Sequence, residues 1–176
     1  MRRAQLDRSP ELSESCASIY SAWTVRENAI LRQLISDYLA ALEKLRPYGI
    51  ESLCDYAEYA FERALGGKRV ARGLKGHDVV VPRLGRVQVK ERRLPADGRI
   101  EERLHLLNVT KSSCDHVGAI IFNNDYTVKK ATLVPHPQVW TLLCAHPDPE
   151  KKVKFDLLAR LPGAIDLTDR LRQVLS

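Results

Sequence analysis

The stretch from Val117 to Phe122 is the feature that most limits how this chain can fold. Its six residues form a nearly continuous apolar run in which no polar residue alternates. Such a run is typical of a central strand covered on both faces, because a strand with one wet face alternates apolar and polar residues. Residues 123–125 (Asn-Asn-Asp) predict a turn, and residues 126–134 predict a hairpin partner. We therefore expect a sheet with helices on both sides.

Helical and extended patterns elsewhere complete the expected architecture. Apolar residues recur every three or four positions over residues 11–46 and over residues 51–65, where a Gly66-Gly67 pair predicts the helix end. The sequence then predicts an α/β fold with a mixed central sheet flanked by helices and an N-terminal helical extension. The remaining expected elements are strands over residues 79–81, 87–94 and 153–158, and helices over residues 100–107, 137–143 and 168–174.

Breaks in these patterns divide the chain into three expected parts. Residues 1–48 form the N-terminal helical extension, which carries little chemistry and is interpreted as a packing or dimerisation element; residues 15–23 are open to being a separate helix. Residues 49–145 form the core. Residues 146–176 begin with the linker His-Pro-Asp-Pro-Glu and are expected to be a C-terminal linker and helix packed on the core.

The lengths of the apolar runs and the spacing of the cysteines indicate the cellular compartment of the protein. No window approaches the 18 to 20 or so apolar residues that cross a bilayer, so no membrane partner is expected. The start, Met1-Arg2-Arg3, has no apolar stretch behind it, which disfavours a secretory signal. The four cysteines are widely spaced, and we interpret them as reduced thiols of a cytoplasmic protein. They are Cys16, Cys54, Cys114 and Cys144.

Two Cys-x-His pairs raise the alternative of a zinc site. The pairs are Cys114 with His116 and Cys144 with His146. Four such ligands suit tetrahedral zinc, but a single intervening residue is shorter than the usual spacing of about two to four. Cysteine is also commonly a small buried apolar residue. The sequence leaves open whether these residues bind metal.

The positive charge of the chain is concentrated in one segment. The whole chain has 28 basic and 22 acidic residues, a formal net charge of +6. Between Arg63 and Arg93 there are ten basic and two acidic residues, so this segment alone carries +8. A charge kept for solubility would be spread over the surface. The local excess predicts an anionic partner, with nucleic acid the leading candidate.

Three polar residues of the predicted hairpin lie within this basic segment. Gln88 and Lys90 are two residues apart on the second strand, so their side chains leave the same face, and the turn brings Asp78 to them. The Asp78 carboxylate, the Gln88 amide oxygen and the Val89 carbonyl are ligands that suit Mg²⁺. Lys90 would orient a water and stabilise developing negative charge. This combination predicts hydrolysis of a phosphodiester.

A second acidic ligand is expected from the preceding helix. Glu58 lies at the border of the apolar face of the helix predicted over residues 51–65. A helix docked against the sheet would place Glu58 beside Asp78.

At these residues the chain resembles the PD-(D/E)XK nuclease superfamily, whose pattern is a helix bearing a Glu, an Asp at a strand, and a strand with (D/E)-x-K. Residues 55–60 are similar to the helix motif, residues 76–78 to the Asp motif, and residues 88–90 stand where (D/E)-x-K is expected. Gln88 departs from the main pattern and is similar to the Q-x-K version of Mrr-type restriction endonucleases. The resemblance covers residues 50–145 and implies a restriction-endonuclease-like fold. It also implies Mg²⁺-dependent DNA cleavage that leaves a 5′-phosphate, often by a dimer.

The resemblance and the chemistry together give the expected roles. The catalytic residues are Glu58, Asp78, Gln88 and Lys90, and the metal ligands are Glu58, Asp78, Gln88 and Val89, with Mn²⁺ able to substitute for Mg²⁺. The residues expected to contact DNA surround them in sequence or lie before the central strand. They are Arg72, Lys75, His77, Arg92, Arg93, Lys111 and Ser112.

Simpler interpretations stay open beside this one. Asp78 fits a turn or strand-edge residue that hydrogen-bonds to Arg86, and Glu58 fits a solvated helix edge. The Q-x-K residues fit the polar face of an ordinary strand. The leading function is a DNA endonuclease of a restriction, defence or related DNA-processing system, as a homodimer or a subunit of a larger complex. The alternatives are a non-catalytic DNA-binding or subunit protein on the same fold, and an RNA-directed or structure-selective nuclease such as a junction resolvase.

Overall fold

The apolar run at the centre of the sequence forms strand β5 (His116–Phe122), which is buried from Val117 onward. The structure is a computed structural model that describes residues 14–71, 76–97, 102–145 and 148–176, with the backbone alone over 14–29. After a turn at residues 123–127, β6 (Val128–Pro135) pairs with β5 in antiparallel orientation. The expected hairpin is therefore confirmed.

Strand β5 lies inside a six-stranded sheet of order β1-β2-β3-β5-β6-β8. The first three strands form an antiparallel meander, β3 runs parallel to β5, and the other neighbouring pairs are antiparallel. The sheet is therefore mixed and mostly antiparallel. Its remaining strands are β1 (Lys68–Arg69), β2 (Val79–Val81), β3 (Gly85–Arg93) and β8 (Ile165–Asp166).

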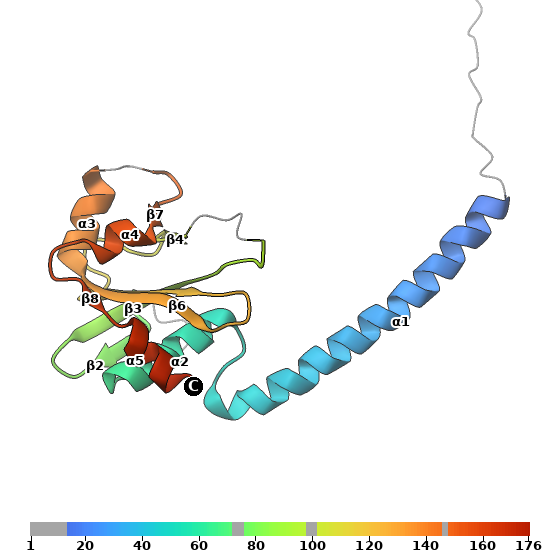
Figure 1. Ribbon diagram of the computed structural model, residues 1–176, viewed down its shortest axis with the longest axis horizontal. Helices are drawn as coiled ribbons and strands as arrows, with labels where there is room; N and C mark the ends of the chain where they lie inside the picture. The colour runs from blue at the N-terminus through green and yellow to red at the C-terminus, as the bar shows by residue number, and fades with distance from the viewer. Residues whose placement is uncertain (1–13, 72–75, 98–101, 146–147) are drawn as a thin grey trace, which may run out of the picture. The chain divides into compact units, whose positions relative to one another are not determined.

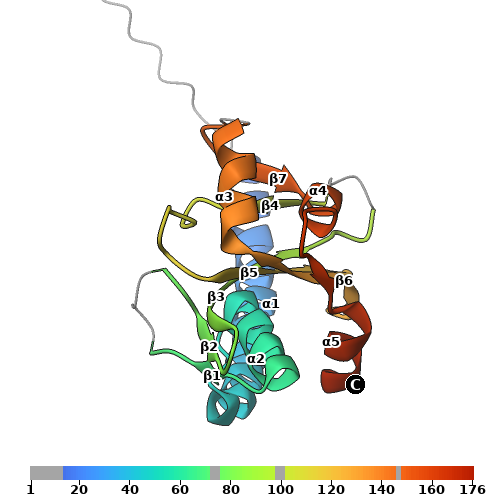
Figure 2. The same ribbon diagram turned by 90° about the vertical axis from the view of Figure 1, so that its left-hand side faces the viewer.

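Helices cover both faces of this sheet (Figures 1 and 2). One core lies between the sheet and helices α2 (Leu53–Leu65) and α5 (Thr168–Val174). The other lies between the sheet and helices α3 (His136–Ala145) and α4 (Phe155–Ala159). Successive residues of β5 alternate between the two cores, with Ile120 in the first and Ile121 in the second. The expected coverage of β5 on both faces is confirmed.

Helix α2 has a strong signal at each end. The hydroxyl of Ser52 accepts a hydrogen bond from the Asp55 amide and donates one to the Asp55 carboxylate, which together cap the helix start. Gly66 ends the helix with a φ of 65°, in the left-handed region that favours glycine. These caps set the two ends of α2, which therefore ends shortly before the β2–β3 hairpin.

A missing side chain lets α2 approach the sheet closely. A Cβ at Gly118 on β5 would lie 2.6 Å from the ring of Phe61, which is fully buried. The ring therefore occupies the space above Gly118, and the side of α2 that carries Phe61 rests on the strands. This docking holds the neighbouring turn of α2, with Glu58, over the sheet.

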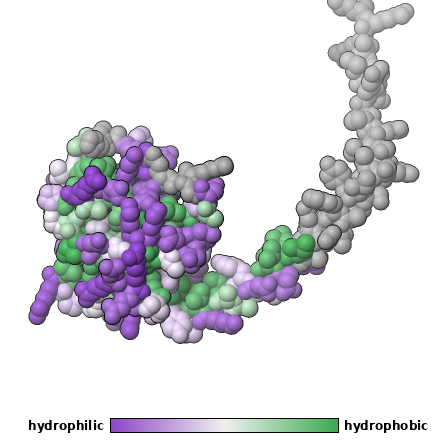
Figure 3. Space-filling view, in the orientation of Figure 1, coloured by the Kyte–Doolittle hydropathy of each residue, from purple (hydrophilic) through white to green (hydrophobic). Residues whose placement is uncertain are grey.

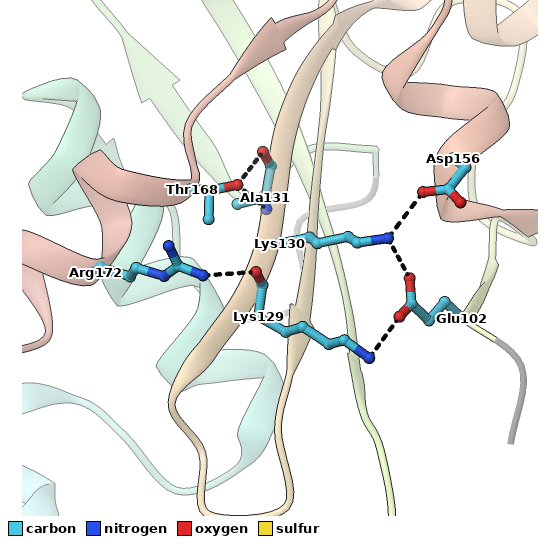
Figure 4. A network of polar contacts seen from close by, with 7 residues as sticks. All are labelled: Glu102, Lys129, Lys130, Ala131, Asp156, Thr168 and Arg172. Atoms are coloured by element: carbon cyan, nitrogen blue, oxygen red, sulfur yellow. Dashed lines mark hydrogen bonds and ion pairs between the residues drawn. The ribbon is translucent and has the colours of Figure 1, made fainter. Parts of the chain in front are cut away.

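Ion pairs and hydrogen bonds connect β6 with Glu102, α4 and α5 (Figure 4). Lys129 and Lys130 both pair with the carboxylate of Glu102, and Lys130 also pairs with Asp156 of α4. The guanidinium of Arg172 on α5 donates to the backbone carbonyls of Val128 and Lys129. These contacts hold α4 and α5 against the same strand.

The N-terminal part of the chain is a separate compact unit, Met1–Pro47, and Tyr48–Ser176 is the other. Within the first unit a single 32-residue helix, α1 (Glu14–Leu45), runs unbroken and is followed by the 3-10 turn η1 (Arg46–Tyr48), so residues 15–23 are not a separate helix. Apolar side chains of α1 are exposed, and Figure 3 draws them in green along the helix. Leu34, for example, is 60% exposed. Its expected packing or dimerisation role stays a prediction.

Two expected elements are wrong. Residues 103–105 form strand β4 (Arg103–His105) instead of part of a helix, and β4 pairs with β7 (Lys152–Lys154) in a small second sheet. Leu104 and Leu106 are both buried, a spacing of two that marks a strand. The strand expected over residues 153–158 stops at Lys154, because Phe155 and Leu158 are buried at helical spacing in α4. Residues 100 and 101 lie outside the described residues.

Candidate active site

Asp78 and Gln88 face each other across the β2–β3 hairpin. The pairing of Val79 with Val87 places Asp78 opposite Gln88, one position before the start of β2. The Asp78 Oδ2 accepts a hydrogen bond from Gln88 Nε2 at 2.5 Å and from the Val89 backbone N–H at 2.6 Å. Asp78 thus lies at the edge of a strand, but the expected bond to Arg86 is wrong, because Asp78 bonds to Gln88 and Val89 while Arg86 pairs with Asp115.

The surroundings of Asp78 act on its charge in opposite directions. Burial raises the pKa of the carboxyl group, while the hydrogen bond from Val89 and the charge of Lys90 are the main influences that lower it, and burial prevails. The Lys90 ammonium is thus near enough to interact with the carboxylate. An anionic group in such a place is stabilised further by a cation.

Gln88 carries an acceptor without a partner. Its side chain is only 5% exposed, and its Oε1 has no hydrogen-bond partner within the described ranges. A buried acceptor left unpaired costs about 1–3 kcal/mol, so such atoms are rare in native proteins. The amide is held by its Nε2 on Asp78, and the Oε1 is left buried and unpaired.

Glu58 lies near enough to Asp78 for their charges to interact. The pKa of Glu58 is raised to about 7, first by burial, then by the negative charges of Asp78 and Asp55, and against the lowering effect of Arg69. A carboxyl group with this pKa readily releases its proton to solvent when a divalent cation binds near neutral pH. The expected approach of the helix glutamate to the hairpin aspartate is supported by this coupling.

Glu91 lies at the site although the sequence motifs do not include it. Cys54 of α2 donates a hydrogen bond to Glu91 Oε1 at 3.1 Å, and burial followed by this bond raises the pKa of the thiol to about 11. Glu91 also raises the pKa of Glu58. Residues 87, 89 and 91 share one face of β3, so a count by twos from the buried Val87 would have placed Glu91 under α2.

The raised pKa of Glu58 predicts that replacing this residue by a neutral one stabilises the fold, by an amount that depends on pH. The folded pKa of about 7 exceeds the usual 4.5, so the ionised carboxylate destabilises the fold above pH 7 and costs nothing below pH 4.5. Because the group is part-exposed, we expect Glu58→Gln to raise the free energy of unfolding by about 1–2 kcal/mol at pH 8.5. Urea unfolding at pH 8.5 and at pH 4.0 measures this. A gain of equal size at both values would contradict the assignment.

The residues expected to contact DNA are distributed around the hairpin. His77 adjoins Asp78 and lowers its pKa by its charge. Lys111 and Ser112 are exposed in a loop. The next residue of this loop is Ser113, and a Cβ placed on Gly76 would lie only 2.9 Å from the Ser113 carbonyl oxygen. The loop therefore lies beside the segment that carries His77 and Asp78. Arg72 and Lys75 lie outside the described residues.

The two arginines at the end of β3 differ in their surroundings. Arg92 is partly buried on the face that carries Gln88 and Lys90, and its Nε finds no hydrogen-bond partner in the described part of the chain. Arg93 is exposed and donates to the hydroxyl of Tyr126 at 3.0 Å. This contact fixes the position of the Arg93 side chain.

The cysteine and histidine residues of the zinc alternative have other contacts. Cys114 is buried and receives a hydrogen bond from the Ser113 hydroxyl, and His116 Nδ1 lies 2.9 Å from the Leu84 carbonyl. Cys144 is exposed on α3, and His146 lies outside the described residues. No three His, Cys, Asp or Glu side chains form a metal-ligand cluster in the ranges that the structure describes. The candidate site at Asp78 differs in kind, since two of its four expected ligands are amide and carbonyl oxygens.

Neither a search for membrane-spanning helices nor comparison with known proteins assigns a function to this site. No helix in the described parts is long and apolar enough to cross a membrane. Comparison with known proteins found no family model that matches the chain and no curated protein similar to it in sequence.

Proposed function

We propose that this chain is a metal-dependent DNA endonuclease with a restriction-endonuclease-like core. The observation that carries the proposal is the unpartnered, buried Oε1 of Gln88 beside the Asp78 carboxylate, within the part of the chain that the structure describes. An amide oxygen and a carboxylate oxygen at one place are what a hard cation such as Mg²⁺ uses as ligands. The charge coupling between Glu58 and Asp78 supports a second anionic ligand from α2.

The order of elements also supports the proposal. A Glu-bearing helix precedes a strand that begins after Asp78, and an antiparallel strand with Gln-Val-Lys follows. The next strand of the sheet, β5, then runs parallel to β3. This order agrees with the pattern of the PD-(D/E)XK superfamily on which the resemblance rests.

Four residues would hold the metal ion. Asp78 and Glu58 supply charge, and Gln88 supplies its Oε1. The Val89 carbonyl leaves β3 on the same side as the N–H that donates to Asp78, beyond the last β2–β3 pair at Val79 and Val87. When bound there, Mg²⁺ would neutralise phosphate charge and lower the pKa of a coordinated water.

Lys90 has the position of a group that acts on the phosphate. Its side chain leaves β3 on the face of Gln88, and its charge acts on Asp78. There the ammonium donates to the attacking water and to the phosphate oxygens as negative charge develops. The water oxygen bonds to phosphorus as the bond to O3′ breaks, the water loses its proton to solvent, and O3′ takes up a proton. The products are a 5′-phosphate and a 3′-hydroxyl.

A cleavage assay with purified full-length chain tests the proposal. Supercoiled plasmid and linear DNA are incubated with Mg²⁺, with Mn²⁺ and with EDTA, beside an Asp78→Ala variant that reports any contaminating nuclease. We expect cleavage with either metal, none with EDTA and none by the variant. DNA binding without cleavage in any metal would instead favour a non-catalytic DNA-binding protein.

The basic segment predicts that DNA binding depends steeply on salt. Each phosphate contact releases counterions, so with four to six contacts the affinity falls by roughly 100- to 1,000-fold between 50 and 200 mM salt. Fluorescence anisotropy with a labelled duplex and EDTA in the buffer measures this. An affinity that stays constant over this range would contradict a contact between the +8 segment and DNA phosphates.

A further inference from the structure

Tyr126 has a backbone conformation that is unfavourable for a tyrosine. It lies in the β5–β6 turn with a φ of 65°, where its N–H donates to the Asn123 carbonyl. A bulky residue in the left-handed region is a rare exception and costs about 1–2 kcal/mol, while Gly or Asn would fit without strain. The Tyr126 side chain is 44% exposed, so burial offsets little of this cost. Strain that packing does not explain is a reason to look for a function of the ring.

A neighbouring cation fixes the ring in place. The Arg93 guanidinium lies over it, with its carbon 4.9 Å from the ring centroid, and also donates to the hydroxyl. Cation–π contact and hydrogen bond together restrict the orientation of the ring. Tyr126 is therefore a fixed, partly open aromatic surface with a positive charge on it.

A pocket of about 540 Å³ opens beside this ring. Its lining includes Tyr126, Tyr56 of α2, Asn123, Asp125 and Arg172 of α5. Tyr56 is itself stacked on Phe122, with ring centroids 5.5 Å apart. The volume is within the usual range of small-ligand sites. Two aromatic rings with amide and hydroxyl groups at the edge suit a flat, hydrogen-bonding heterocycle.

The pocket lies along the strand that carries the candidate catalytic residues. Arg93 is three residues after Lys90 on β3, about 10 Å along the strand, and its side chain leaves the opposite face, which is the face of Glu91. Arg93 pairs with Phe122, so the pocket adjoins the carboxyl ends of the parallel strands β3 and β5. Glu91 precedes Arg93 by two residues on the same face and its charge acts on Glu58, so a nucleic-acid strand held at this carboxylate side of the site reaches the pocket with a nearby nucleotide.

We propose that the pocket binds an unpaired nucleobase of the DNA substrate, stacked on Tyr126, beside the scissile phosphate. This inference rests on the proposed function and names a preferred substrate: DNA that holds a single-stranded or unpaired segment beside its duplex part. Stacking accepts any base, because every base has a π face. The pocket therefore selects for unpaired structure, and the positive charge of Arg93 holds the adjoining phosphate.

Ring-specific variants of the full-length chain test the stacking role. Tyr126→Phe keeps the ring, and Tyr126→Leu keeps an apolar side chain and the backbone strain but has no π face. Anisotropy with a labelled single-stranded oligonucleotide in EDTA measures affinity, and Tyr48→Leu is the control, since Tyr48 is a tyrosine exposed elsewhere. We expect Tyr126→Phe and the control to bind as the wild type does, and Tyr126→Leu to bind between about 5- and 100-fold more weakly.

A glycine variant separates this role from a structural one. Tyr126→Gly removes both the ring and the strain, so we expect a melting temperature equal to or above that of the wild type together with the same loss of affinity. Equal single-strand affinity of wild type and Tyr126→Leu would overturn the proposal, as would absence of single-strand binding by the wild type. In either case, Mg²⁺-dependent duplex cleavage lost in Asp78→Ala would leave the proposed endonuclease intact. Conversely, single-strand binding that depends on the ring, without any cleavage, would contradict the proposed endonuclease activity and support the base pocket.

Discussion

Replacing Lys90 by alanine is expected to slow DNA cleavage by about 100- to 1,000-fold while DNA affinity falls less than about tenfold. The side chain lies on the face of Gln88, and its charge acts on the Asp78 carboxylate. A donor that stabilises charge in the transition state contributes about this much to rate, whereas one phosphate contact contributes little to affinity. Single-turnover cleavage and anisotropy, both on the same duplex, separate the two effects.

A matched variant shows that the loss belongs to the site. Lys44 is an exposed lysine of α1, and Lys44→Ala removes the same charge from the other unit. We expect Lys44→Ala to cleave at the wild-type rate. Equal rates for wild type and Lys90→Ala would remove Lys90 from the catalytic assignment, whatever the metal dependence of the activity.

The hairpin that carries the site could be predicted because its information is local. The β-branched run Val79–Val81 marks the first strand and a two-residue period marks the second, and the turn between them fixes which residues face each other. The placement of Asp78, Gln88 and Lys90 follows from that register alone. The apolar run that forms β5 is equally local, since consecutive apolar residues of this kind leave few alternatives to a covered strand.

The face of β3 that carries Glu91 follows from the same two-residue period, but the contacts that this acidic residue makes with α2 could not be predicted in the same way. Glu91 meets Cys54 of the preceding helix only because α2 docks closely on the sheet. That docking depends on Phe61 above Gly118, a contact between residues far apart in sequence. The strand at residues 103–105 is hidden from sequence analysis for a similar reason, since its partner β7 comes much later in the chain. Pairings of this kind are decided by tertiary packing, which a local pattern does not contain.

Replacing Gln88 by glutamate is expected to make the fold depend on metal. The Nε2 that donates to Asp78 becomes a second carboxylate oxygen, at a position only 5% exposed. The Asp78 carboxylate that it then faces already interacts with the charge of Glu58. Two facing buried carboxylates repel each other and lose hydration, so the free energy of unfolding at pH 8.5 in EDTA falls by about 2–4 kcal/mol. A divalent cation between them reverses this loss, since a ligand at about 100 times its Kd contributes about 2.7 kcal/mol.

Urea unfolding in EDTA and in Mg²⁺ measures this change, with Gln88→Leu as the matched control. The leucine variant loses the hydrogen bond to Asp78 without gaining charge, so Mg²⁺ should leave its stability unchanged. The wild type should gain less from Mg²⁺ than Gln88→Glu, because a neutral oxygen binds the ion more weakly than a carboxylate. If Gln88→Glu gains no more from Mg²⁺ than the leucine variant, position 88 is not a metal ligand. The unpartnered oxygen of Gln88 would then be a polar group of the core, and Lys90 would act without a metal ion held beside it.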